Sequence, residues 1–334
     1  MKIFKNKVII VFICLFVLLV VSILVSLWLG TTNISILDIA HLLLANDNSD
    51  LRQTIFYIRL PRIIMAIMTG AALAVSGCVF QAILKNPLTD PFTLGISGGA
   101  AFGAATAFVS GIFAITSAFI VPLFALCGVL ISVFIVYMLS YYKDFDSNSM
   151  ILSGVVVSYI FSSLVMLLYI LAPSQSVHAA VMWLMGSLSY VDIKILPFIS
   201  IFIFIGVLFL TFCGNVLNLV ALGGDKSKTL GVNITRTIKL LFFVASAITA
   251  ITVSVCGIIG FVGLMIPHIM KKIVGANNTI LIPICAICGA IFLLICDTIA
   301  RIIALPIQLP VGIVTSIIGG VFFIFLLVGV KRKI

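Results

Sequence analysis

The sequence predicts an all-α protein that crosses a membrane many times. Hydrophobic residues make up 63% of the 334 residues, and charged residues only 8%. A soluble domain of this size could not solvate the surface that such a composition leaves exposed. The apolar residues occur in runs of about 20, the length at which an α-helix spans a hydrocarbon core of roughly 30 Å. Runs such as Val8–Leu29 lack the polar–apolar alternation of a membrane β-barrel.

Ten apolar segments are expected to form the spanning helices of one transmembrane domain, residues 1–334. They are 8–29, 60–84, a Gly- and Ala-rich helix from 94, 120–142, 150–171, 195–212, 237–255, 257–274, 280–303 and 311–330. A proline-rich elbow, Lys85–Pro91, ends the second helix. Residues 173–192 are only moderately apolar and predict a short interfacial or re-entrant helix, with Trp183 at the lipid headgroups.

The distribution of lysine and arginine predicts the orientation of the chain. Ten spans place both termini on one side of the membrane, and 14 of the 19 basic residues fall on that side. Basic residues are enriched on the cytoplasmic side of membrane proteins. We therefore expect a multi-pass protein of a bacterial cytoplasmic membrane, with both termini in the cytoplasm.

A polar stretch, residues 217–239, separates the sixth and seventh helices. It carries one acidic and four basic residues, and Gly223, Gly224 and Gly231 punctuate it. In this topology the stretch lies in the cytoplasm, so we interpret it as a docking segment for a motor protein rather than as a linker.

A repeated spacing of glycine and proline weakly favours an inverted repeat. Gly77 precedes Pro87 by ten residues, and Gly257 precedes Pro267 by the same spacing. The two helices concerned run in opposite directions in the predicted topology, which is a common arrangement in transporters.

No set of residues indicates catalysis or a bound metal. The sequence has no GxSxG, HExxH or Gly-rich loop ending in GK[ST]. Its three histidines lie far apart, and its eight cysteines lie inside apolar runs, where packing is their expected role. An intramembrane enzyme would need a convergent Ser, His or Asp set. We expect no enzymatic activity and no directly bound cofactor.

Asp297 is the best candidate for a functional carboxylate inside the membrane. Such a residue could mark an ion-coupled secondary transporter. Arg301 follows four residues later, so the two side chains can pair on one helix face. We expect Asp297 to hold Arg301 rather than to relay protons, and we keep a secondary transporter that uses Asp297 as the alternative.

Three arginines at the predicted outer ends of helices allow two interpretations. Arg59 and Arg62 flank Leu60-Pro61, and Arg301 lies near the end of the ninth helix. They could simply snorkel to lipid headgroups. They could instead form an electropositive surface that docks an acidic partner, since arginine binds carboxylates in a bidentate manner.

Short motifs then narrow the interpretation. They are Arg59-Leu-Pro-Arg62, Gly70–Gly77 with Gln81, Asn86-Pro-Leu88, Leu94–Ser97, Trp183–Ser187, Leu230-Gly-Val232, Gly260–His268, Asp297–Arg301 and Leu309–Gly312. In their order and spacing, over about residues 15–330, they resemble the FecCD family. This family comprises permease subunits of ABC importers for iron–siderophores, haem and cobalamin.

The resemblance implies a type II ABC importer permease, its partners and its site residues. The partners would be a second permease copy or a paralogue, two cytoplasmic ATP-binding subunits that hydrolyse ATP, and an extracytoplasmic substrate-binding protein. Arg59, Arg62 and Arg301 would meet acidic residues of that binding protein. The ATPase contact would involve Leu222, Gly223, Asp225, Ser227, Leu230 and Gly231. The cytoplasmic gate would involve Asn86, Leu88, Ser147 and Asn148.

The chain also departs from the family pattern. The polar stretch carries less acid than relatives do, and Asn277-Asn278-Thr279 stands where relatives often have an acidic residue, His and Arg. This inner loop is therefore less charged than in relatives. An iron–siderophore is the expected cargo, with haem or cobalamin as alternates.

Overall fold

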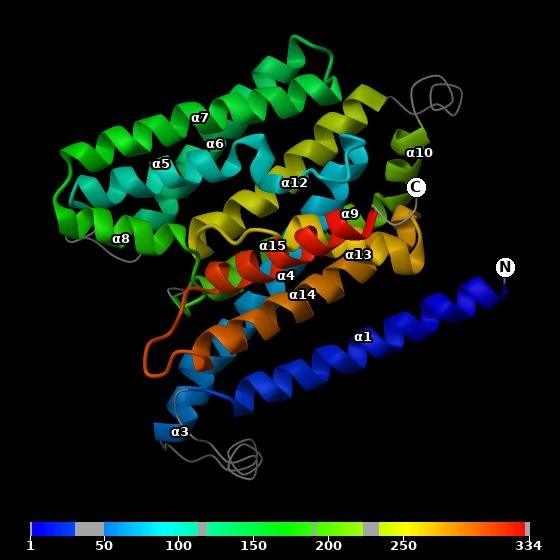
Figure 1. The fold of residues 1–334 in the computed structure, drawn as a ribbon, viewed down its shortest axis with the longest axis horizontal. Coiled ribbons are helices and arrows are strands. Elements are labelled where there is room, and N and C mark those ends of the chain that lie inside the picture. The colour runs from blue at the N-terminus through cyan, green and yellow to red at the C-terminus, as the bar shows by residue number, and fades with distance from the viewer. Residues whose placement is uncertain (1, 31–49, 113–118, 190–191, 223–233, 331–334) are drawn as a thin grey trace.

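The computed structural model describes residues 2–30, 50–112, 119–189, 192–222 and 234–330, and the regular elements in these ranges are helices (Figure 1). In chain order they are α1 Lys2–Trp28, α3 Asp50–Gln53, the π-helix η1 Thr54–Arg59, α4 Leu60–Ile83, the 3₁₀ helix η2 Pro91–Leu94, α5 Ile96–Val109, α6 Ile120–Tyr141, α7 Ser147–Leu171, α8 Ser174–Leu184, α9 Leu196–Phe212, α10 Gly214–Leu222, α12 Ile234–Cys256, α13 Val262–Val274, α14 Asn278–Ile302 and α15 Val311–Val330.

Each of the ten apolar segments that the sequence marks is a helix, but the helices differ in length. Among the described residues, seven helices are long and apolar enough to cross a membrane, and α9 with α10, bent by 54°, would make an eighth. The remaining two, α5 and α13, have 14 and 13 residues. At 1.5 Å per residue each is about 20 Å long, too short to span the hydrocarbon core alone.

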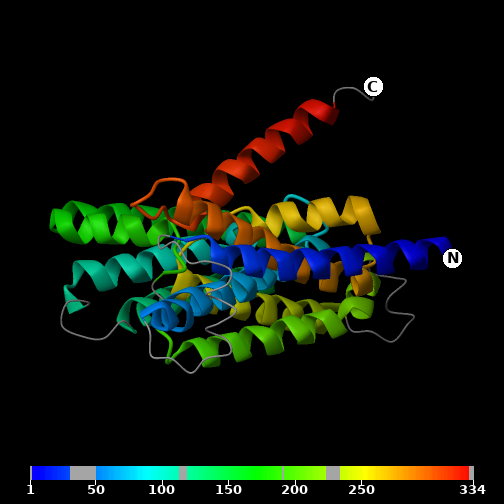
Figure 2. The same cartoon turned by 90° about the horizontal axis from the view of Figure 1, so that it is seen from below.

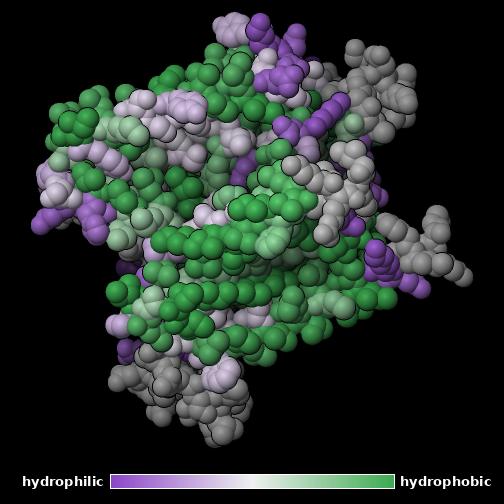
Figure 3. All heavy atoms as spheres, in the orientation of Figure 1, coloured by the Kyte–Doolittle hydropathy of each residue, from purple (hydrophilic) through white to green (hydrophobic). Residues whose placement is uncertain are grey.

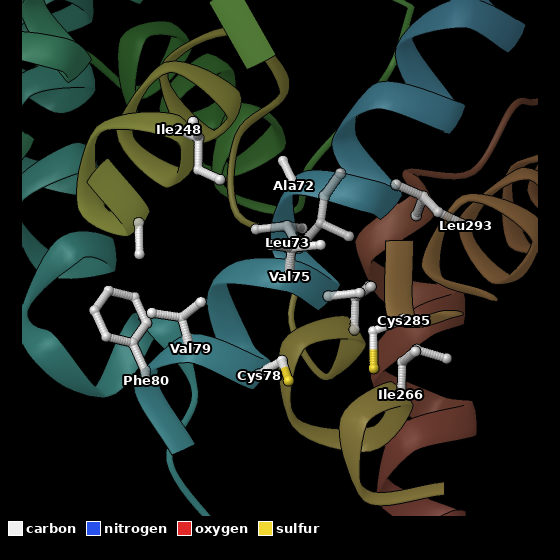
Figure 4. Close-up of a cluster of buried hydrophobic side chains, with 14 of the residues drawn as sticks. Ala72, Leu73, Val75, Cys78, Val79, Phe80, Ile248, Ile266, Cys285 and Leu293 are labelled. Atoms are coloured by element: carbon white, nitrogen blue, oxygen red, sulfur yellow. The ribbon is translucent and has the colours of Figure 1, made fainter. Parts of the chain in front are cut away.

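The core is built around α4, which packs against α12, α13 and α14 (Figure 4). Val75, Val79 and Phe80 of α4 are fully buried. Small residues allow this close packing: a Cβ atom on Gly70 would collide with the backbone of Gly289 on α14. An aromatic contact between Phe80 and Phe242, with ring centroids 5.9 Å apart, joins α4 to α12.

A second cluster of buried side chains joins α5, α6 and α8. Trp183 on α8 packs there with Ile96 and Ala100 and is only 7% exposed. The expected short helix after α7 is therefore present. The Trp183 ring fills space in the protein interior, and its position at the level of the lipid headgroups stays a prediction.

The eighth predicted helix begins five residues later than expected. Gly257 has φ 71° and lies against the backbone oxygen of Trp183, where no side chain would fit. Phe261 also adopts a left-handed conformation, with φ 69°. Since left-handed residues interrupt a helix, α13 starts only at Val262.

The element order supports an internal repeat. Helix α4 is followed by a break and the short α5, and α12 is followed by a break and the short α13. Contacts of Thr69 with Cys256 and of Phe80 with Phe242 show that α4 and α12 run antiparallel. This relation fits the predicted inverted repeat.

The bundle has two chemically different ends. The arginine end comprises Arg59, Arg62 and Arg301 with the C-terminal end of α1. The lysine end, at the other end of α4, comprises Lys85, Lys143 and Lys239. The N-terminal end of α1 and the C-terminal end of α15 lie on the same side of the bundle (Figures 1 and 2), as an even number of spans requires. Between the ends, apolar side chains cover the face of α1, α14 and α15 (Figure 3).

Candidate functional site

A buried ion pair between α4 and α14 forms the centre of the arginine end. Arg62, in the first turn of α4, donates from Nε to both carboxylate oxygens of Asp297, at 2.9 and 3.0 Å. Its Nη2 lies 2.9 Å from the same carboxylate. The remaining nitrogen, Nη1, donates to Ser189 Oγ at 2.8 Å and to Gln308 Oε1 at 2.6 Å. Arg62 thus ties α4 to α14, to the loop that holds Ser189 and to the loop after α14 that holds Gln308.

Arg301 approaches the same carboxylate from the next turn of α14. Its Nε lies 3.2 Å from Asp297 Oδ2, which confirms the pairing that the sequence spacing predicts. Its Nη2 donates to the backbone oxygen and to Oγ of Ser26, at 3.1 and 2.6 Å. Ser26 is fully buried, although most of α1 is exposed. Arg301 therefore attaches the end of α1 to the bundle.

Arg59 completes the cluster from the π-helix η1, which adjoins α4. Its Nη1 donates to the backbone oxygens of Leu27 and Trp28 at the C-terminal end of α1. Gly30 leaves room for this side chain, because a Cβ atom there would lie 2.7 Å from Arg59 Nη2. Short π-helical segments are frequent at functional sites.

The three arginines are buried, so their side chains are not open to solvent in this structure. Arg59, Arg62 and Arg301 are 4%, 7% and 4% exposed, and Asp297 is not exposed at all. One carboxylate, that of Asp297, pairs with the two guanidinium groups of Arg62 and Arg301, so these three groups together carry one excess positive charge. An acidic partner at this end would meet a positive field, with the arginine side chains already fixed in place.

Sequence reasoning found Arg62 and Asp297 separately but missed their pairing. The two residues are 235 positions apart, and no periodicity connects them. Ser26, Ser189 and Gln308 were also missed as members of the cluster. The one available signal was a serine inside the otherwise apolar first helix, because a buried hydroxyl needs a hydrogen-bond partner.

At the lysine end, the structure describes the predicted gate residues. Asn86 accepts a hydrogen bond from the backbone N–H of Leu88 at 2.9 Å, and Leu88 is 58% exposed. Ser147 and Asn148 form the first turn of α7, which Asp146 caps through the N–H of Ser149. Both segments lie on turns at this end of the bundle, where residues can move without disturbing the core.

Leu222, the last residue of α10, is the one predicted coupling residue that lies within a described helix. The others, Gly223, Asp225, Ser227, Leu230 and Gly231, lie outside the described residues. The helix that leads into them is tied to α14: Asn218 donates to Asn277 Oδ1 at 2.7 Å and accepts from the N–H of Asn278 at 2.8 Å. The asparagines that depart from the family pattern thus serve to join α10 to α14.

The described residues offer no group of three or more His, Cys, Asp or Glu side chains that could hold a metal ion. The cluster at the arginine end can orient charge and bind carboxylates. It contains no hydroxyl or thiol paired with a general base, so it does not support nucleophilic catalysis.

Comparison with known proteins agrees with this architecture. Residues 18–329 match the FecCD transport family. The chain is 37% identical over 278 residues to the Fe(3+) dicitrate transport system permease protein FecD of Escherichia coli K12, covering 82% of this chain and 84% of that protein. It is 32% identical over 320 residues to the hemin transport system permease protein HmuU of Yersinia pestis, covering 93% and 94%.

A solved structure shares the same fold over almost the whole chain. It shows an inward-facing conformation of an ABC transporter assigned to the metal-chelate type. The TM-score is 0.83 at 30% sequence identity, and the match covers 99% of this chain and 100% of the other.

Proposed function

Because the chain belongs to the FecCD transport family, we propose that it is the permease of an ATP-driven importer that carries an iron–siderophore complex across the cytoplasmic membrane. The observation that carries the proposal is the match of nearly the whole chain to a metal-chelate type ABC transporter. The relatives named for Fe(3+) dicitrate and hemin transport favour a chelated-iron cargo. Haem and cobalamin are the alternates. ATP would be hydrolysed by two copies of a separate cytoplasmic subunit.

The arginine end would dock an extracytoplasmic binding protein. Its excess positive charge would attract acidic residues of that partner, and guanidinium groups bind carboxylates with two parallel hydrogen bonds. Asp297 would act as a positioning residue, because it fixes Arg62 and Arg301 before the partner arrives. The burial of the arginines implies that partner carboxylates compete with Asp297 or Gln308 for them.

The lysine end would face the cytoplasm, together with both termini. Within the polar stretch 217–239, residues 222–231 would contact the ATPase, and residues 86–88 and 147–148 would form the gate. Helix α14 offers a mechanical link between the two functions. Its first turn binds α10 through Asn278, and Asp297 lies near its other end, about 29 Å away at 1.5 Å per residue. A tilt of α14 would therefore move both its contact with α10 and the ion pairs of Asp297.

Two permease copies, or one copy with a paralogue, would enclose the cargo path. Helices α7 and α15 expose apolar faces, with Tyr159 at 72% and Phe325 at 71% exposure. By the resemblance to the family, these helices would line the pathway, and the second copy would cover part of this surface.

The secondary-transporter alternative has no support in the structure. A proton- or Na⁺-coupling carboxylate must be reached from water, whereas Asp297 is inaccessible and is paired with two guanidinium groups. The pairing supports a role for Asp297 in holding the two arginines.

Reconstitution would test the proposal. Proteoliposomes would contain the chain, the ATPase and the binding protein encoded beside it. We expect ATP-dependent uptake of a ⁵⁵Fe–hydroxamate siderophore, with lower uptake of hemin and of cobalamin. Arg62→Glu should abolish stimulation of the ATPase by the binding protein while the ATPase still co-purifies.

A scramble of residues 223–228 should give the opposite result, with loss of ATPase co-purification. If the ATPase never co-purified with the unaltered chain, the importer proposal would fail. Higher uptake of hemin or cobalamin than of the siderophore would refute the cargo alone.

A further inference from the structure

An apolar groove between α6 and α12 is not used by the functions proposed above. It has a volume of about 740 Å³, within the range of pockets that bind organic molecules. Leu130 and Phe134 of α6 face Leu240 and Phe243 of α12 across it. These four side chains are 51–65% exposed, so the groove opens onto the outer surface of the bundle. Its chemistry fits a hydrocarbon chain.

A single cation, Lys239, is the charged residue that lines the groove. Its Nζ lies 4.7 Å from the ring centre of Tyr141 and 5.0 Å from that of Phe145. Phe145 is itself buried and packs edge-to-face on Tyr137, with ring centroids 5.3 Å apart. The two cation–π contacts hold the ammonium group beside the apolar surface.

Lys239 has no anionic partner within the described part of the chain. Both ion pairs found there involve Asp297, at the opposite end of the bundle. The ammonium group lies level with the α6–α7 turn, where the apolar run of α6 ends, and a membrane-spanning α6 would place this level near the lipid phosphates. An apolar groove that ends at an unneutralised cation at this depth matches a molecule with a hydrocarbon tail and an anionic head.

We propose that the groove between α6 and α12 binds one anionic phospholipid, with an acyl chain along Leu130, Phe134 and Phe243 and its phosphate on Lys239. Basic pockets between transmembrane helices on the cytoplasmic side commonly bind anionic headgroups. The lipid would cover exposed apolar surface of two helices and would brace the start of α12. This site needs only the membrane location of the chain, so it is independent of cargo and of the ATPase.

Photo-crosslinking tests the site directly. The full chain would be placed in nanodiscs that contain phosphatidylcholine and a trace of phosphatidylglycerol with a diazirine on one acyl chain. We expect labels on peptides containing residues 130–137 and 240–243, located by mass spectrometry. The same diazirine on phosphatidylcholine should label these peptides about fivefold less. This factor corresponds to the attraction of one lysine to an anionic lipid surface.

Matched variants separate the groove from general surface charge. Lys239→Gln should lower the phosphatidylglycerol label about fivefold, and Lys143→Gln, an exposed lysine of the adjacent turn, should leave it unchanged. A thermal unfolding curve would verify that both variants fold. If Lys239→Gln did not fold, the comparison of the two lipids on the unaltered chain would still test whether the groove prefers an anionic lipid.

Three results would overturn the proposal. They are equal labelling by the two lipids, labelling that does not depend on Lys239, and crosslinks between the groove peptides of two copies of the chain. The last result would show that a second copy covers the groove.

Discussion

The two ends of the bundle both carry positive charge but neutralise it differently. At the arginine end, Asp297 lies between Arg62 and Arg301, and the groups are buried. At the lysine end, Lys239 rests on aromatic rings and is partly exposed. The first arrangement has an internal anion and a defined geometry, whereas in the second no anion among the described residues pairs with Lys239.

The arginine end therefore has side chains that are fixed in advance, whereas the lysine end has a cation that is available to bind a partner. A buried ion pair with several hydrogen bonds holds its groups in one arrangement, and removal of one partner leaves an uncompensated charge. A cation at a surface stays solvated by water, so replacing one of its neighbours costs little free energy. We therefore expect one substitution at the arginine end to destabilise the whole cluster, and one substitution at the lysine end to have only a small effect.

The largest effect should follow from Asp297→Asn. This change leaves the guanidinium groups of Arg62 and Arg301 buried without their carboxylate, and breaking a buried pair in this way costs about 3–5 kcal/mol. We expect a lower midpoint of thermal unfolding in detergent, together with weaker binding of the partner at this end.

Asp144→Asn provides the matched control for that variant. Asp144 is exposed on the α6–α7 turn with φ 50°, a conformation that asparagine adopts readily. The midpoint of thermal unfolding of Asp144→Asn should change little, as is usual for a surface substitution. Equal midpoints for Asp297→Asn and the unaltered chain would show that the pair does not organise the arginine end.

A smaller change at the same end acts through space rather than charge. Gly30→Ala would place a methyl group 2.7 Å from Arg59 Nη2 and force that side chain off the end of α1. We expect the free energy of unfolding to fall by about 2 kcal/mol, the size of a broken hydrogen bond with a charged donor. Thermal unfolding would measure it. Gly320→Ala is the control, since nothing lies within 4 Å of a Cβ atom there; equal losses in both would remove the link to Arg59.

At the lysine end, the carboxyl of Asp90 predicts a pH dependence of stability. Burial raises the pKa of Asp90 to about 7, against hydrogen bonds from the backbone of Phe92 and Phe261. The pKa in the fold thus exceeds that in the unfolded chain, so the stabilisation is complete below the unfolded value and is lost as pH rises through about 7. Between pH 6 and pH 8 the loss should be about 1 kcal/mol.

Unfolding midpoints from pH 5 to pH 9 would test this dependence. Asp90→Asn keeps the hydrogen-bond acceptor for the Phe92 N–H but does not titrate, so its stability should change less over the same range. A parallel decline in both proteins would assign the effect to another group.

Hydropathy alone located the helices because each apolar run has to be hydrogen-bonded within itself in lipid. It could not find where α13 begins, because the break at Gly257–Phe261 depends on contacts with Trp183 and on left-handed residues. Composition also did not reveal the burial of Trp183, since an amphipathic ring suits both the headgroups and an interior cavity.

The site shows the same limit more sharply. The pairing of Asp297 with Arg301 is local, and its spacing is visible in the sequence. The stronger contact with Arg62 and the anchoring of Ser26 exist only after α1, α4 and α14 have packed. The sequence therefore indicated which residues carry charge, while the fold decides which of them are neutralised.

The smallest expected effect, a response to salt, separates the two ends. Raising the salt from 0.1 M to 1 M shortens the screening length from about 10 Å to about 3 Å, which weakens exposed charge interactions but hardly affects buried ones. The difference in unfolding midpoint between Asp297→Asn and the unaltered chain should stay the same. The preference of the α6–α12 groove for phosphatidylglycerol over phosphatidylcholine should fall, because Lys239 is open to ions. If the Asp297 difference shrank with salt as well, water and ions would reach the arginine end, and the two ends would differ in degree only.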